Sequence, residues 1–256
     1  MTSVLSSSLL TTLRLALMAA VVSGTMGLVS STSAEAAGAV EQQQLIDKAT
    51  LTVDAFAADP SVGGGIRDLK SGAKGIFIVP QFLRGAFVFG GAGGSGVLIV
   101  RDEKTKKWSE PVFYTIGSAS FGLQIGGDVS EMIFVIRNQK GLEEFYRSEF
   151  KLGGDVSMTV GPTGEGASAK GIAGDLVGYA KKKGAFAGMS VDGAVIAVSD
   201  ESNHAYYGKP VRPTDIILKQ AVSNPKSAEL KNAVDKLMKE HSRPQAPRLH
   251  RGGLHG

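Results

Sequence analysis

A glycine motif is the first feature of the chain whose spacing could do chemistry. Residues 91–96 read Gly-Ala-Gly-Gly-Ser-Gly and match the G-x-G-x-x-G spacing of a dinucleotide-binding loop. Such a loop directs the amino terminus of a helix at a pyrophosphate. Here residues 97–100 read Val-Leu-Ile-Val, which is a strand pattern. The sequence therefore favours a hairpin bent by glycines over a nucleotide site.

Groups suited to catalysis or metal binding are few. The chain has no cysteine, and His204 is the only histidine before the tail at 241–256. Asp128, Glu131 and Asp155 lie near Gly-Gly turns, where acidic residues commonly serve as turn residues. No serine-nucleophile elbow and no H-E-x-x-H pair occurs. We therefore predict a protein that is not an enzyme and has no cofactor or metal; a hydrolase using Asp128, Glu131 or His204 is the disfavoured alternative.

Positive side chains gather beside apolar and aromatic residues at three places. They are Lys74 and Arg84 around the apolar run 76–83, Lys104, Lys106 and Lys107 before Trp108, and Lys181, Lys182 and Lys183 between Tyr179 and Phe186. This pairing suits a membrane surface, where a lysine contributes about 1 kcal/mol against anionic headgroups and an aromatic ring lies at the interface. A solvated hairpin tip is the alternative for each cluster.

The amino-terminal segment predicts export. Residues 15–34 carry no charge, and Ala34-x-Ala36 is a small-x-small pattern that a signal peptidase accepts, so we expect cleavage after Ala36. A retained membrane anchor is the alternative, but serine, threonine and glycine dilute the second half of the run. The absence of cysteine excludes a lipoprotein anchor and disulfides. We expect a periplasmic or secreted protein that is peripheral to a membrane.

The charge of the chain gives little support to a nucleic-acid partner. The formal net charge is +4, and the tail 241–256 holds three arginines and no acidic residue. The excess is therefore mostly local, whereas a nucleic-acid binder carries a basic face across its fold.

Hydrophobic spacing predicts helices at both ends and strands between them. Leu45, Ala49, Val53 and Phe56 form one apolar stripe, which predicts a helix over 41–59. Most of the 34 glycines lie between residues 63 and 208, among the apolar runs 75–80, 85–90, 96–102, 131–138 and 193–200. Short strands at this glycine density predict a strongly curved antiparallel sheet or a small barrel. The predicted fold class is α+β.

The connections follow from the turn residues. The charged run 101–108 predicts a solvent-exposed hairpin turn between the strand 96–100 and the segment 111–114. Residues 139–150 read as a helix with Leu142 on its apolar side, Pro213 starts a helical pattern, and residues 227–241 predict a closing helix.

Several motifs, in the same order, resemble the SYLF family of lipid-binding domains, also called Ysc84-like. They are Gly94-Ser95-Gly96, Trp108-Ser109-x-Pro111, residues 120–127 (SFGLQIGG), Lys151-Leu152-Gly153-Gly154-Asp155 and residues 183–188 (KGAFAG). The resemblance implies phospholipid binding without catalysis, association of eukaryotic members with actin and phosphoinositides, and exported envelope proteins among bacterial members. It also places Lys74, in the Ala-Lys-Gly-Ile motif, in a basic lipid-contact region.

Together these observations define the hypotheses. We expect a signal peptide at 1–36, a SYLF-like domain at 41–220, a C-terminal helix at 221–241 and a disordered basic tail at 242–256. The domain would adsorb reversibly to anionic phospholipid headgroups through the lysine clusters, Arg84 and Trp108. An envelope scaffold that binds a protein or a polysaccharide is the alternative. The motifs leave open whether the interior of a barrel would hold a ligand.

Overall fold

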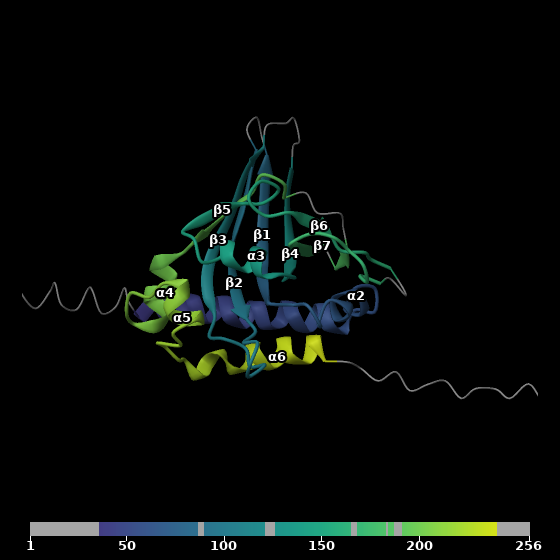
Figure 1. Ribbon diagram of the computed structural model, residues 1–256. Coiled ribbons are helices and arrows are strands. Elements are labelled where there is room, and N and C mark those ends of the chain that lie inside the picture. The colour runs from purple at the N-terminus through teal and green to yellow at the C-terminus, as the bar shows by residue number, and fades with distance from the viewer. Residues whose placement is uncertain are drawn as a thin grey trace, which may run out of the picture.

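In the computed structural model, one strongly curved sheet lies between two layers of helices (Figure 1). The structure describes residues 36–239 except 87–89, 121–125, 165–167, 183 and 187–190. An N-terminal helix covers residues 36–58 and is followed by α2 (Gly63–Asp68). The later helices are α3 (Gln139–Glu144), α4 (Asp200–Tyr207), α5 (Pro213–Ile217), the 3₁₀ turn η1 (Pro225–Ser227) and α6 (Ala228–Met238).

Within the described residues, nine strands form the sheet. They are β1 (Gly75–Ala86), β2 (Gly90–Val100), β3 (Val112–Ser120), β4 (Gly126–Ile136), β5 (Glu149–Lys151), β6 (Met158–Val160), β7 (Leu176–Lys182), β8 (Ala185–Phe186) and β9 (Val195–Val198). Their order is β5-β9-β3-β2-β1-β4-β7-β6, with β8 paired to β7. All pairs are antiparallel except β6 with β7. Of the two predicted architectures, the structure therefore has the curved sheet, with β5 and β6 at its edges.

The sheet bends where β1 and β2 depart from regular geometry. The register of β1 against β4 shifts between Val79 and Phe82, which places Pro80 and Gln81 in a bulge. A bulge bends its strand and tolerates proline, which cannot donate to the ladder. Opposite the bulge, a Cβ on Gly94 would lie 2.2 Å from the carbonyl oxygen of Gln81. The two backbones can therefore approach only because residue 94 is glycine.

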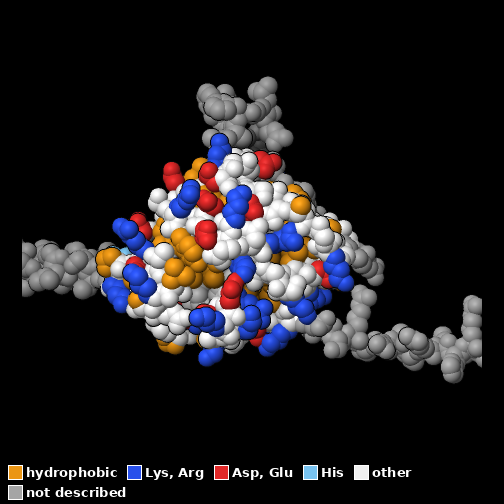
Figure 2. Space-filling view, in the orientation of Figure 1, with side chains coloured by type: hydrophobic (Ala, Val, Ile, Leu, Met, Phe, Trp, Pro, Cys, Tyr) orange, Lys and Arg blue, Asp and Glu red, His pale blue; other side chains and the backbone are white. Residues whose placement is uncertain are grey.

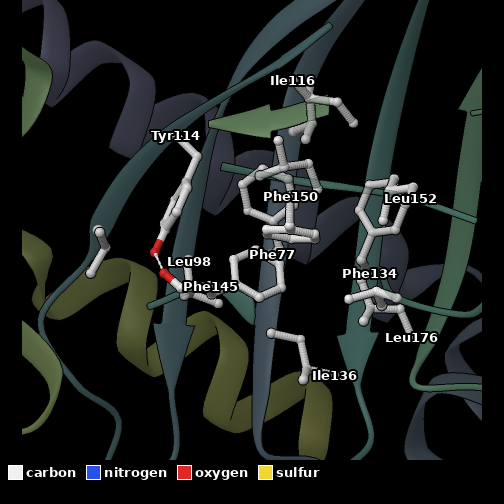
Figure 3. Close-up of a cluster of buried hydrophobic side chains, with 14 of the residues drawn as sticks. Phe77, Leu98, Tyr114, Ile116, Phe134, Ile136, Phe145, Phe150, Leu152 and Leu176 are labelled. Atoms are coloured by element: carbon white, nitrogen blue, oxygen red, sulfur yellow. Dashed lines mark hydrogen bonds between the residues drawn. The ribbon is translucent and has the colours of Figure 1, made fainter. Parts of the chain in front are cut away.

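Both faces of the sheet are buried, each against its own hydrophobic cluster. On the inner face, Phe77 lies at the centre of an aromatic group, with ring centroids 5.5 Å from Phe145, 5.8 Å from Tyr114 and 5.9 Å from Phe134 (Figure 3). Side chains therefore fill the concave side of the sheet. On the outer face, the N-terminal helix and α6 pack on Ile76 and its strand neighbours. Two-sided burial explains why the central strands read as unbroken apolar runs.

Most predicted elements are confirmed. The predicted stripe of the N-terminal helix faces the outer cluster, and the hairpin around 101–108 and helices at 213 and 228 are present. Two predictions need correction. The helix expected over 139–150 ends at Glu144, because Phe150 pairs with Ile196 in the sheet. The run 85–90 is divided between two strands: Gly85 and Ala86 end β1 and Gly90 begins β2, while 87–89 lie outside the described residues.

Some predictions fall outside the described residues. They are the signal peptide through residue 35, Lys183, most of the motif 120–127, and the tail from residue 240 onward. Among the helices that the structure describes, none has the length and apolar character needed to cross a membrane.

Candidate functional site

The basic turn at residues 101–108 is a rigid structure. The carboxylate of Asp102 accepts hydrogen bonds from the backbone N–H groups of Lys104 and Thr105 at 3.0 and 2.6 Å and from the Thr105 hydroxyl at 2.9 Å. These bonds from Thr105 hold the pKa of Asp102 below its usual range. Lys106 has φ of 60°, a left-handed conformation that closes the turn. The fixed backbone presents Lys104, Lys106 and Lys107 as exposed side chains.

Acidic neighbours balance only part of the charge at this turn. Lys74, directly before β1, forms an ion pair with Glu103, and its hydrogen bond lowers the pKa of Glu103. The ammonium groups of Lys104, Lys106 and Lys107 have no carboxylate within ion-pair distance among the described residues. Three cations are therefore available to an anion in solution.

Trp108 closes the turn opposite Arg101. The two residues form an isolated β-bridge, and the Arg101 guanidinium lies 6.0 Å from the centre of the indole ring. The indole is partly buried against the outer cluster, and its Nε1 is buried without a hydrogen-bond partner in the described part of the chain. Trp108 therefore anchors the base of the turn and reaches the surface with only part of its ring.

An open groove of about 610 Å³ lies beside the turn. One wall is the turn itself, with Lys74, Lys104, Lys107 and Trp108. The remaining walls are mostly apolar and come from the end of α3 and the segment around α5; they include Leu142, Tyr146, Ile216, Ile217, Leu218 and Val222. Figure 2 shows hydrophobic side chains exposed on this side of the molecule, with positive and negative side chains around them. The groove thus combines a cationic margin with apolar walls.

Glu110 joins the groove to the C-terminal helix. Its carboxylate lines the groove and accepts hydrogen bonds from Lys231 at 2.7 Å and from the Ser227 hydroxyl at 2.7 Å. The backbone N–H of Asn224 donates to it at 3.3 Å. Because η1 and α6 are held in this way, the wall formed by residues 216–223 has a fixed position against the turn.

The other predicted lipid-binding residues that the structure describes lie away from the turn. Lys181 and Lys182 lie on β7, where Lys181 pairs with Asp59 at 3.5 Å and Lys182 pairs with Asp128 at 2.5 Å. Arg84 lies on β1, opposite Asp128 of β4. Of the nine predicted residues, the structure brings Lys74, Lys104, Lys106, Lys107 and Trp108 together at one end of the sheet.

The candidate catalytic residues form no catalytic group among the described residues. Asp128 is paired with Lys182, and Glu131 accepts a hydrogen bond from Thr52 of the N-terminal helix at 3.2 Å. The Asp155 carboxylate accepts from the backbone N–H of Lys151 at 2.8 Å, as expected of a turn residue. Within the same ranges, no three acidic or histidine side chains form a cluster that could hold a metal ion.

Sequence reasoning missed the groove walls opposite the turn. Leu142, Ile216 and Ile217 read as ordinary core residues of two helices, which they also are. Only Leu218 could have indicated an apolar surface here. It directly follows Ile216 and Ile217 in a short helical pattern that starts at Pro213. The network of Glu110 had no local signal, because its partners lie more than 110 residues further along the chain.

The fold and the groove define a class of α+β domain in which one curved sheet separates two cores and ends at a basic turn. Residues 117–237 match the family model described as "Ysc84: Las17-binding protein actin regulator". Over these residues the chain is similar to the Ysc84 family, also called SYLF, which is the family that its motifs resemble. The description of this family names a regulator of actin and not an enzyme.

Several curated proteins are similar to the chain. "LAS seventeen-binding protein 3" of Saccharomyces cerevisiae is 37% identical over 150 residues, which cover 55% of this chain and 32% of that protein. "Protein YSC84" of the same yeast is 35% identical over 144 residues, covering 53% and 30%. "SH3 domain-containing YSC84-like protein 1" of Homo sapiens is 31% identical over 149 residues, covering 57% and 43%. The chain thus spans less than half the length of each of these relatives.

Proposed function

We propose that this chain is an exported, non-catalytic module that adsorbs reversibly to anionic phospholipid surfaces through the turn at 101–108. The observation that carries the proposal is the set of three exposed ammonium groups without carboxylate partners, on Lys104, Lys106 and Lys107. The rigid backbone of the turn holds them close together, so one patch of anionic headgroups can meet all three. Export remains a proposal that rests on residues 15–36.

Because of ion pairs elsewhere, this proposal assigns lipid binding to fewer residues than the sequence hypothesis did. Lys181 and Lys182 are engaged by Asp59 and Asp128, and Lys74 by Glu103. A lysine that already has a carboxylate partner contributes less to a second anion, because the attraction is partly cancelled. The turn lysines should therefore account for most of the electrostatic attraction to the membrane.

Co-sedimentation with liposomes tests the proposal on the full chain. Vesicles of phosphatidylcholine alone report any binding through the apolar segment 15–34, and vesicles that also contain phosphatidylglycerol report the anionic component. Replacing Lys104, Lys106 and Lys107 by glutamine should weaken the anionic component on the order of 100-fold, since each lysine is worth about 1 kcal/mol. High salt should weaken it in the same direction.

The control removes the same charge from another surface. Lys226, Lys236 and Lys239 are exposed and lie on η1 or at and near the end of α6. Their replacement by glutamine should leave binding within a few-fold of the unchanged chain. Equal losses in both triple variants would mean that net charge alone drives binding, and no preference for anionic vesicles would overturn the proposal.

A protein-binding scaffold is the second candidate. It is favoured by the names of the yeast relative and of the family model, which describe Las17-binding proteins. Retained function in cells after the turn lysines are changed to glutamine, together with loss of vesicle binding, would favour the scaffold.

A further inference from the structure

Leu218 is an exposed leucine on a segment with a fixed backbone. Its side chain is 61% exposed, whereas the preceding Ile216 and Ile217 are buried in the inner cluster. The N–H groups of Leu218 and Lys219 donate to the carbonyl of Thr214 at 3.0 and 3.1 Å. Lys219 also pairs with Asp215 at 2.8 Å. Leu218 therefore cannot turn inward, and it stays at the surface as part of the groove wall.

The groove has the size and lining of a site for one small amphiphile. A volume of about 610 Å³ falls within the range of roughly 300–1,000 Å³ that is usual for small-molecule sites. Leu218 and the partly buried Val222 and Tyr146 provide apolar contact along it. Lone exposed apolar residues need no explanation, but here they share one groove with a cationic margin. A bilayer surface that meets only the exposed turn would leave these walls unused.

Charge complementarity identifies the occupant. The groove lining holds four cationic residues, Lys74, Arg101, Lys104 and Lys107, and three acidic ones, Asp102, Glu103 and Glu110. Glu103 and Glu110 pair with Lys74 and Lys231, and the Asp102 carboxylate accepts backbone N–H groups of the turn, whereas Lys104 and Lys107 have no ion pair among the described residues. The free charge at the groove is therefore positive and lies at the turn, while the apolar walls lie opposite. A phosphate with several acceptor oxygens can meet more than one ammonium group.

From these observations we propose that the groove binds a lysophospholipid, an anionic phospholipid with a single acyl chain. The phosphate lies at the ammonium groups of Lys104 and Lys107, and the chain lies along Leu218 and Val222. We assign a single chain because the groove volume lies within the range that is usual for one small molecule. The inference rests on the proposed function, because it assigns a monomeric ligand to the site that meets the membrane.

The single tryptophan of the chain reports on this site. Trp108 is the only tryptophan and lines the groove. Lysophosphatidylglycerol with a 9,10-dibromostearoyl chain, added to the full chain below its critical micelle concentration, should quench Trp108 fluorescence saturably, because bromine quenches on contact. The same headgroup is present in the vesicle experiment, so the two assays differ only in whether a single chain can be taken up.

Three variants separate the parts of the site. Leu218→Gln should weaken quenching about tenfold, since most of the apolar contact of that side chain is lost. Leu51→Gln is its matched control: Leu51 is 68% exposed on the N-terminal helix, outside the groove, and quenching should not change. The triple glutamine variant of Lys104, Lys106 and Lys107 should weaken quenching more strongly than Leu218→Gln.

The outcomes distinguish this inference from the proposed function. Binding to anionic vesicles without quenching by the monomeric lipid overturns the groove assignment and leaves the proposed function intact. If the chain neither binds anionic vesicles nor shows quenching by the monomeric lipid, both the groove assignment and the proposed function are overturned. Equal quenching by brominated lysophosphatidylcholine, unchanged in the lysine variant, overturns the role of the charge. Quenching by free 9,10-dibromostearate but not by the lysophospholipid overturns the assignment of a phosphate.

Discussion

At the scale of single residues, Glu110 has the most consequential environment near the groove. It lies directly after the Trp108-Ser109 pair, its side chain is 13% exposed, and Lys231 lies 2.7 Å away on α6. The Ser227 hydroxyl donates to the same carboxylate. Glu110 therefore links the β2–β3 hairpin, the groove and the C-terminal helix through hydrogen bonds of one side chain.

Glu110→Ala should lower the free energy of unfolding by about 1–3 kcal/mol, because it leaves partly buried donors without their acceptor. Urea denaturation monitored by circular dichroism measures this. The matched control is Asp235→Ala, which removes an exposed ion pair with Lys239 on the same helix and should cost less than about 0.5 kcal/mol. Equal losses would show that the Glu110 network contributes no more than a surface pair.

The sequence could predict the residues of the turn but not those of the network. Three lysines within four residues of a charged hairpin turn stay solvent-exposed whatever the rest of the fold does. Whether a given lysine is already paired depends on the register of distant strands. Lys182 meets Asp128 because β4 pairs with β7. That pairing has no signature in the residues around either side chain.

At the scale of elements, the glycines of β2 have a structural role. A Cβ on Gly96 would lie 2.5 Å from the ring atoms Cε2 and Cζ of Phe77 and 2.9 Å from the carbonyl oxygen of Ile78. Phe77 is held by Tyr114, Phe134 and Phe145 and has little room to move. The motif that resembles a nucleotide loop is thus the place where a strand passes directly over an aromatic ring.

Gly96→Ala should therefore lower the free energy of unfolding by about 1–3 kcal/mol through overpacking. Gly91→Ala lies on the same strand, where a Cβ would have no neighbour within 4 Å, and should be close to neutral. Thermal denaturation of the two variants side by side measures the difference. A tolerated alanine at 96 would contradict the close approach of the strand to Phe77.

The helix predicted over 139–150 shows where a local sequence pattern fails to predict structure. Residues 139–150 have helical spacing, yet α3 ends at Glu144. Phe145 and Phe150 instead meet at 4.7 Å in the inner cluster, and β5 joins the sheet edge. Burying both phenylalanines in the inner cluster stabilises the protein more than extending α3 would. The inner cluster forms only when the sheet is complete, so the local sequence pattern gives no sign of it.

At the scale of the whole molecule, composition and spacing predicted the α+β class and the curvature of the sheet. The strand order could not be predicted from the sequence, because β9 pairs with β3 and β7 pairs with β4 across long stretches of chain. The apolar runs 76–79 and 132–136 give little sign of which residue faces which core, since both faces are buried.

The inner side is also tied together by one buried carboxylate, and this gives the protein a pH dependence. Burial alone would raise the pKa of Asp175, but hydrogen bonds from Ser157 and Asn138 outweigh it and hold the pKa well below its usual range. They link the start of β7 to the residue before β6 and to the amino-terminal cap of α3.

A lowered pKa in the folded state means that Asp175 stabilises the fold above its unfolded pKa of about 3.9 and loses this effect as the pH falls further. Asp175→Asn should therefore be destabilised at pH 7, and its difference from the unchanged protein should shrink below about pH 4. Urea midpoints at pH 7 and pH 3 measure this, with the exposed Asp54→Asn as control. A difference that stays constant with pH would contradict this role.

The outer core is assembled from the two ends of the described chain. The N-terminal helix, residues 36–58, and α6, which ends at Met238, pack on the same face of the sheet and share one cluster (Figure 1). A ribosome must therefore release almost the entire domain before that face can close. The outer core is therefore the last part of the described domain that can be completed during synthesis.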